Sequence, residues 1–353
     1  MKIVRKLYLS VLSLILVAMT FTATTFAWFQ INSSASVDGF DFELQSGLGF
    51  VVSSDGENFK NAITSKEIKQ LIIINQNSED YELVSGELIN KESQAKLTEA
   101  DMNKYLSEEV LFLPLTSQNG IDLIDLYNST PKLESGRYIE FSIFFKAASN
   151  VKEDNLTYDI YLNGEDITNS TTGQAVSKTS ISSEATEVEL KANMTAYNNG
   201  TVMNYVKGDK ITVYSSNAMR MSIEDTSSDT PKATIYELSD EQDLEFGSYA
   251  TDYSGEDITL KKLYNADESA MFTYYNNLRP NSRLQKLEYE SKPQSIRTLG
   301  TEDQPKVTTV TSGEDAKLVT FRFWLEGWDA DCFDGLAKAI SVKLSFTSKR
   351  VIE

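Results

Sequence analysis

Alternation of apolar and polar residues marks the segments of this chain that we expect to form half-buried β-strands. The clearest run points Ile139, Phe141, Ile143 and Phe145 to one side, because successive side chains of a strand face opposite ways. Further strands are expected at Phe40 to Leu44, Leu48 to Val52, Leu156 to Leu162, Val188 to Leu190, Ile211 to Tyr214, Met219 to Ile223, Ile235 to Leu238, Val319 to Leu325 and Ile340 to Phe346. Short strands separated by turns predict an all-β fold, an antiparallel β-sandwich of jelly-roll-like form.

Two turns and two short helices complete the expected sandwich. Asn163-Gly164 is expected to start a hairpin after its strand, and Asn198-Asn199-Gly200 is expected to form another turn, because these residues tolerate positive φ. Helical patterns at Ser65 to Leu71 and Thr98 to Leu106 are expected to decorate the sheet. Thr98 is a plausible N-cap, with Asp101 three residues later.

The stretch from about 237 to 305 breaks the alternation. It is acidic, contains several tyrosines and carries prolines at positions 280, 293 and 305. We interpret it as an insertion between strands. Its tyrosines either bind a sugar or a protein, or simply cover a loosely packed insertion.

The first residues of the chain have the layout of an export signal. Three cations, Lys2, Arg5 and Lys6, precede an uncharged run from Leu7 to Phe26 and a group of small residues that ends at Ala27. We expect cleavage between Ala27 and Trp28, although the run is also long enough to remain as a membrane-anchoring helix. The predicted organisation is a signal peptide or uncleaved anchor at 1–27, a flexible leader at 28–39 and a β-sandwich domain at 40–353 with its insertion at about 237–305.

Composition excludes several classes of function. Lys and Arg number 33 and Asp and Glu number 52, which gives a net charge of −19 and argues against nucleic acid or an anionic lipid surface as partner. The chain has no histidine, so His-based zinc sites, Ser-His-Asp triads and Cys-His catalysis are excluded. Cys332 is the only cysteine and is expected to be a small buried apolar residue. We therefore expect no enzyme and no catalytic residue.

One acidic segment is a candidate calcium site. Four carboxylates fall within nine residues, at Glu326, Asp329, Asp331 and Asp334. Carboxylate oxygens are the ligands that Ca²⁺ prefers, although the spacing is not that of an EF-hand loop. The alternative is that Asp331 or Asp334 caps a short helical turn over 333–338, with Trp324 and Trp328 in the core. We expect no other cofactor.

The sequence around the cleavage site resembles a known group of export signals. The residues that carry the resemblance are Thr25-Phe26-Ala27-Trp28-Phe29, the polar Gln30, Asn32, Ser33 and Ser34 after them and, more weakly, the alternating strand Ile340 to Phe346. They resemble the camelysin- and TasA-type biofilm-matrix and surface-fibre proteins of Gram-positive bacteria, which are exported by a dedicated signal peptidase of the SipW type. The family often has glycines before the site, where this chain has Thr24 and Thr25.

The resemblance implies a secreted structural protein of the cell surface or extracellular matrix. Its partners would be copies of itself or other matrix subunits, with the signal peptidase during export and the membrane only through the N-terminal segment. In such a fibre the leader 28–39 acts as a donor strand that completes a neighbour's sheet, and Trp28, Phe29 and Ile31 provide its apolar anchor. The first alternative is a membrane-anchored adhesin that binds a protein or glycan through its tyrosine-rich insertion. The second is an envelope hydrolase, which the absence of histidine disfavours most.

Overall fold

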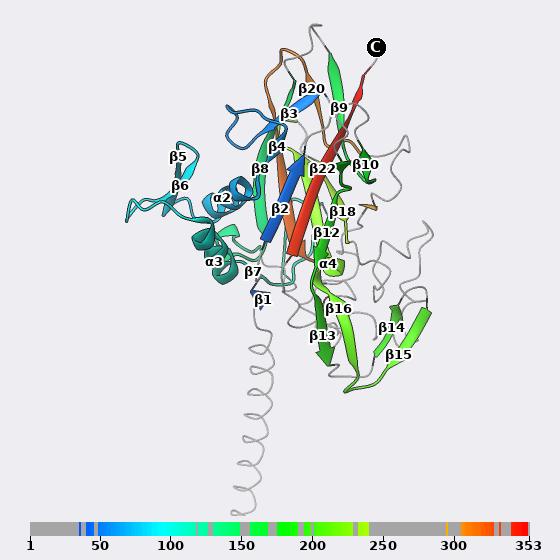
Figure 1. Cartoon of the computed structure of the whole chain (residues 1–353). Coiled ribbons are helices and arrows are strands. Elements are labelled where there is room, and N and C mark those ends of the chain that lie inside the picture. The colour runs from blue at the N-terminus through cyan, green and yellow to red at the C-terminus, as the bar shows by residue number, and fades with distance from the viewer. Residues whose placement is uncertain are drawn as a thin grey trace, which may run out of the picture. The chain divides into compact units, whose positions relative to one another are not determined.

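The computed structural model shows a mostly β protein built around two six-stranded sheets (Figure 1). The structure describes residues 35–36, 40–45, 49–117, 119–125, 130–148, 156–168, 175–189, 194–198, 201–228, 232–239, 294–295, 305–327, 332 and 340–351. The export signal, the cleavage site and the apolar residues that follow it lie outside these ranges. The all-β prediction with antiparallel sheets is confirmed.

The first sheet is built around the long strand β22. Its strands are β20 (Thr308–Thr311), β9 (Thr157–Leu162), β22 (Ile340–Arg350), β2 (Phe40–Gln45) and β4 (Ala62–Ile63) in that order, with β12 (Ser180–Ser183) also paired to β22. β2 runs parallel to β22, whereas the other pairs in this sheet are antiparallel. The sequence did not indicate this parallel pair.

The second sheet contains two nine-residue strands. Its order is β19 (Gln294–Ser295), β18 (Ala233–Glu237), β17 (Met219–Asp225), β21 (Lys317–Leu325), β8 (Ile139–Ala147) and β3 (Phe50–Ser53). β8 buries every second side chain, as its alternation predicts. The strand pairs of this second sheet are antiparallel except for the two-residue pair of β18 and β19.

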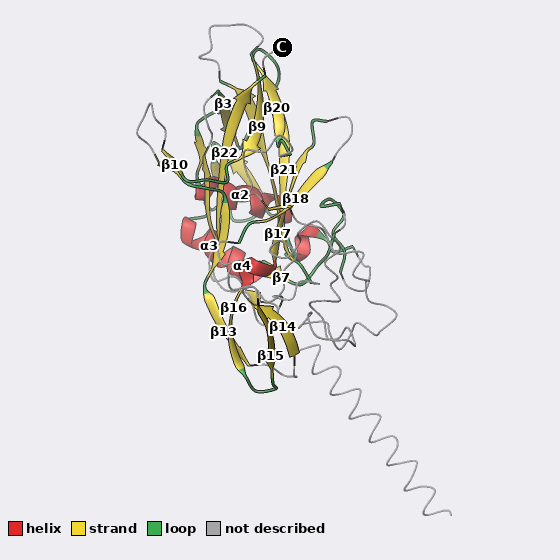
Figure 2. Ribbon diagram, turned by 90° about the vertical axis from the view of Figure 1, so that its right-hand side faces the viewer, coloured by secondary structure: helices red, strands yellow, loops and turns green. Residues whose placement is uncertain are grey.

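The two sheets pack face to face through a common apolar core. Phe346 of β22 lies between two phenylalanines of the other sheet, with ring centroids 5.3 Å from Phe145 and 6.1 Å from Phe321. Both contacts are edge-on, a favourable arrangement for aromatic rings. Figure 2 shows β22 and β9 of the first sheet next to β21 and β17 of the second.

Two helices cover one side of the sheets. α2 (Ser65–Gln76) packs against β2, β8 and α3 (Glu99–Glu109). Each begins with a capping box, in which the side chains of Thr64 and Thr98 accept hydrogen bonds from the third residue of the helix. The predicted cap at Thr98 is therefore confirmed. α2 runs five residues beyond its predicted end at Leu71.

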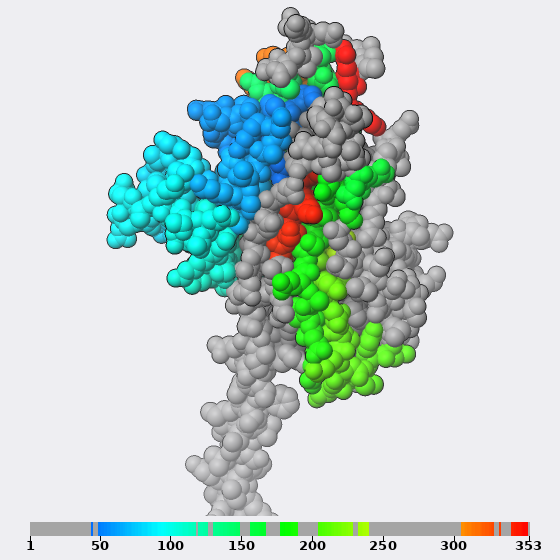
Figure 3. Space-filling view, viewed as in Figure 1, coloured from blue at the N-terminus to red at the C-terminus, as the bar shows by residue number. Residues whose placement is uncertain are grey.

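Several small two-stranded units extend from this body. They are β5 (Tyr81–Val84) with β6 (Glu87–Asn90), β10 (Ile167–Thr168) with β11 (Ala175–Val176), β13 (Ala185–Glu189) with β16 (Lys210–Tyr214), and β14 (Met194–Asn198) with β15 (Thr201–Tyr205). In Figure 3 the cyan β5–β6 unit projects from the surface. The register pairs Asn198 with Thr201, and the two residues of the predicted turn between them lie outside the described residues.

The predicted hairpin at Asn163-Gly164 is wrong. β9 pairs with β20 and β22 and not with the strand that follows it in sequence. Asn163 is buried, and its side-chain amide donates to the backbone carbonyls of Glu165 and Ser177 at 2.8 and 3.1 Å. Because this amide ties two parts of a longer loop together, the asparagine stabilises that loop instead of a tight turn.

Most of the predicted insertion lies outside the described residues. Its start, Glu237 to Ser239, forms the end of β18 and the residues after it, and β19 lies within the insertion. The role of its tyrosines remains a prediction.

Candidate assembly interface

The first long strand of the described chain lies beside its last strand. β2 pairs with β22 from Phe40 opposite Ile340 to Gln45 opposite Ser345. Leu44 of β2 is completely buried and belongs to the same core as Leu344. β2 is therefore held both by a full ladder of backbone hydrogen bonds and by a core side chain.

The opposite side of β2 is covered only in part. β4 pairs with Leu44 and Gln45 alone. Among the described strands, none pairs with β2 on this side over Phe40 to Glu43. A strand edge without a pairing strand is the kind of edge to which another strand can add, although α2 also packs against β2.

The chain just before β2 is attached to the body by a very short pairing. β1 (Ala35–Ser36) pairs with β7 (Leu111–Phe112) through two residue pairs, Ala35 with Phe112 and Ser36 with Leu111. Isolated two-stranded pairings are at best marginally stable in water, even when they are longer. Besides this short pairing, β1 also contacts α3.

The predicted assembly and cleavage residues are not among the described ones. Ala27, Trp28, Phe29 and Ile31 all precede the first described residue. Sequence reasoning missed the β1–β7 pair and the place of β2 between β22 and β4. The alternation of Ile340 to Phe346 identified β22, but alternation gives no information on which strand lies beside it.

The calcium prediction rests on residues of which only one is described. Glu326 is completely buried, and its carboxylate accepts a hydrogen bond of 3.2 Å from the indole nitrogen of Trp324. Asp329, Asp331 and Asp334 lie outside the described residues. Within the described ranges, no group of three or more His, Cys, Asp or Glu side chains is placed to hold a metal ion.

Other predicted side chains of this segment lie in the interior. Trp324 is completely buried, as the helix-cap alternative expected. Cys332 is also completely buried and belongs to the main core. It occupies the place of a small apolar residue, as predicted.

Two ion-pair groups lie within the second sheet. Arg322 of β21 donates to Glu140 of β8 and Glu224 of β17, both at 2.5 Å, and so joins three strands. Burial by itself lowers the pKa of Arg322, but the two carboxylates outweigh it and raise the pKa above its usual value. Arg220 and Glu237 form a second, completely buried pair at 3.5 Å. Both groups join neighbouring strands of this sheet.

Comparison with known proteins gives no match. No protein-family profile fits the chain, and no curated protein or solved structure resembles it at a significant level. In the part of the chain that the structure describes, no helix is long and apolar enough to cross a membrane.

Proposed function

We propose that this chain is an exported structural protein of a bacterial surface or extracellular matrix and the subunit of a fibre. The body is a jelly-roll-like sandwich, and the segment before β2 leaves its own body to add a strand to a neighbour. The observation that carries the proposal is the two-residue attachment of β1 to β7. A segment held so weakly is available for exchange between subunits.

The acceptor is the open side of β2. A strand that pairs along Phe40 to Glu43 extends the first sheet in line with β4. The added strand gains a row of backbone hydrogen bonds, and the sequence supplies Trp28, Phe29 and Ile31 as apolar anchors. Strand exchange between subunits is thereby favoured over the short pairing of β1 with β7 in the same subunit.

Charge opposes assembly and sets its conditions. Each subunit carries a net charge of −19, so neighbours repel one another. Salt at 0.1 M largely screens this repulsion between charges more than about 10 Å apart, and divalent cations can bridge carboxylates. Fibres are therefore expected to form more readily with added salt or calcium.

A reversible lock tests the exchange. Ser36→Cys and Leu111→Cys place two thiols on paired residues of β1 and β7, in a Cys332→Ala background that removes the natural thiol. In the purified chain from Trp28 to Glu353, the closed disulfide holds β1 on the β7 of its own subunit. It is therefore expected to abolish the filaments seen by electron microscopy. Reduction is expected to restore them.

The matched control locks a pair that does not exchange. Ser142 of β8 and Thr320 of β21 are register partners whose hydroxyls lie 2.8 Å apart, and their double cysteine variant should assemble in both redox states. Filaments from the oxidised β1–β7 variant would show that β1 stays paired with β7 of its own subunit during assembly, which contradicts the exchange. Monomers under every condition would favour the anchored adhesin instead.

A further inference from the structure

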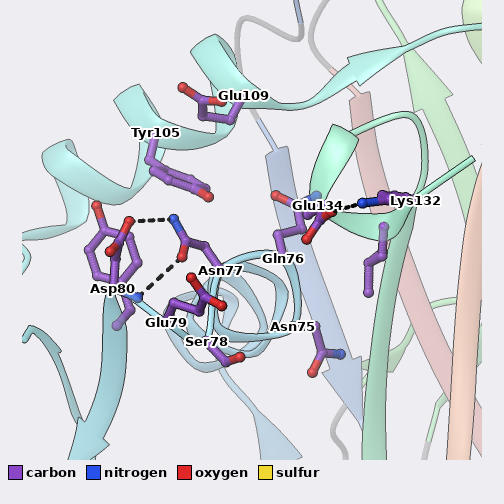
Figure 4. A pocket seen from close by; sticks show the side chains of 12 residues that line it. Asn75, Gln76, Asn77, Ser78, Glu79, Asp80, Tyr105, Glu109, Lys132 and Glu134 are labelled. Atoms are coloured by element: carbon purple, nitrogen blue, oxygen red, sulfur yellow. Dashed lines mark hydrogen bonds and ion pairs between the residues drawn. The ribbon is translucent and has the colours of Figure 1, made fainter.

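A polar cavity lies at the end of α2 (Figure 4). It measures about 880 Å³ and is bounded by the last residues of α2, the turn to β5, one side of α3 and the short helix η1 (Leu133–Ser135). Cavities of this size hold small organic ligands. Its lining is mainly polar, with Glu79, Asp80, Glu109 and Glu134 as acids and Lys132 as the single base.

One wall of the cavity is fixed by its own hydrogen bonds. Asn77 donates to the Asp80 carboxylate at 2.9 Å and accepts from the Asp80 backbone N–H at 3.2 Å. The ring of Tyr105 meets the ring of Tyr81 edge-on at 5.6 Å. Burial, reinforced by the charge of Glu109, raises the pKa of Tyr105 to about 12. The Tyr105 hydroxyl therefore keeps its proton at physiological pH.

The opposite wall contains an unusual glutamine. Gln76 is only 6% exposed, and neither its amide nitrogen nor its amide oxygen has a hydrogen-bond partner within the described part of the chain. Leaving buried polar atoms unpaired is costly because they lose their hydrogen bonds to water, so such groups call for an explanation. Figure 4 shows this side chain extending from α2 toward η1, next to Glu134.

An exposed ion pair lies beside the glutamine. Lys132 and Glu134 are 3.0 Å apart, with side chains 79% and 64% exposed. Surface pairs of this kind contribute little to stability. A ligand that displaces Glu134 therefore reaches the amide of Gln76 at low cost.

The unpaired amide restricts the chemistry of the ligand. Its oxygen needs a donor and its nitrogen needs an acceptor, and a hydroxyl group can serve as either. An ammonium group has only donors and would leave the nitrogen unpaired, whereas an anionic ligand would be repelled by the carboxylates of the lining. Adjacent hydroxyls of a sugar satisfy both atoms, and the Tyr81–Tyr105 pair offers an amphipathic surface nearby.

We propose that this cavity binds a neutral saccharide. Gln76 is its central hydrogen-bonding residue, and Tyr105 donates a second hydrogen bond. The inference is independent of fibre assembly, since the cavity contains none of the residues of β1, β2, β7 or β22.

The test is calorimetric titration of the full-length chain in a detergent that has no sugar head group. The probes are neutral tetrasaccharides of glucose and of N-acetylglucosamine, with the tetramers of glucosamine and galacturonic acid as cationic and anionic arms. At least one neutral probe is expected to bind. Gln76→Leu is expected to weaken that binding at least about tenfold, as loss of hydrogen bonds to a buried amide predicts, without lowering the melting temperature.

A second glutamine of the same helix provides the matched control. Gln70 is also buried, but its amide nitrogen donates to the Gly86 carbonyl at 3.2 Å. Gln70→Leu is expected to lower the melting temperature and to leave saccharide binding unchanged. The proposal is overturned if no neutral probe binds, if only a charged probe binds, or if Gln76→Leu binds as tightly as the natural chain.

Discussion

At the scale of single residues, Glu67 connects a helix start to a neighbouring loop. Its carboxylate accepts hydrogen bonds from the backbone and hydroxyl of Thr64 at 3.1 and 2.8 Å, and it also pairs with Lys60. Burial raises the pKa of Glu67, but the hydrogen bonds from Lys60 and Thr64 outweigh it, so that the pKa lies below 4.5. The charged form of this group is therefore the one that the fold stabilises.

Replacing Glu67 should remove part of the acid sensitivity of the fold. Because the folded state lowers this pKa, the stabilisation is present above about pH 4.5 and is lost as the pH falls through the folded-state value. Glu67→Gln is expected to melt below the natural chain near neutral pH, and the two melting temperatures should converge in acid. Glu314→Gln, an exposed change in the β20–β21 turn, controls for charge. A constant difference at all pH values would contradict this assignment.

At the scale of elements, local sequence patterns predicted the helix cap and the strands that depend on local interactions. The Thr98 cap and the alternating strands β8, β21 and β22 followed from spacing alone. The end of α2 was not predicted from the sequence, because Ile72, Ile73 and Ile74 are β-branched and have low helix propensity. Burial of the first two against the sheets overrides that preference and carries the helix on to Gln76. The cavity wall at Gln76 was missed for this reason.

The pairing of elements was harder to predict than their positions. β2 was placed correctly, but its parallel partner lies far along the chain. An alternating pattern states which face of a strand is buried and nothing about its neighbours. The β1–β7 pair carries even less signal, since it involves two residues on each side.

The turn after η1 requires glycine for a steric reason. Gly136 has φ +64°, and a Cβ there would lie 1.8 Å from the carbonyl oxygen of Glu109 at the end of α3. The Gly136 carbonyl also accepts a hydrogen bond of 2.9 Å from Leu111. Gly136→Ala is expected to lower the free energy of unfolding by about 3 kcal/mol or more, because strain adds to the conformational cost.

A second glycine separates these two contributions. Gly313 also has a positive φ, of +83°, but a Cβ there would meet nothing within 4 Å. Gly313→Ala is expected to cost only about 1 kcal/mol. Urea unfolding of both variants gives the comparison. Equal losses would mean that the clash at Gly136 is relieved by a small shift of α3.

At the scale of the whole molecule, the stacking of the two sheets depends on a few large side chains. Phe346 is completely buried and touches rings of β8 and β21. Phe346→Ala is expected to lower the free energy of unfolding by about 3–5 kcal/mol, through lost burial and a cavity between the sheets. Phe346→Leu, which keeps much of the volume, should cost less than about 1.5 kcal/mol. Chemical denaturation measures both, and a loss below 1 kcal/mol for the alanine variant would refute the stacking role.

The pairing of β2 with β22 also determines when during synthesis the first sheet can form. Phe40 and Ile340 are register partners separated by about 300 residues, and at roughly 5–20 residues per second a ribosome needs about 15 seconds to a minute to make that stretch. Throughout this interval β2 has been synthesised while its main partner does not yet exist. The first sheet therefore forms late in biogenesis. Until then β2 has an unpaired edge on the growing chain, and a holdase or another nascent copy can bind that edge first.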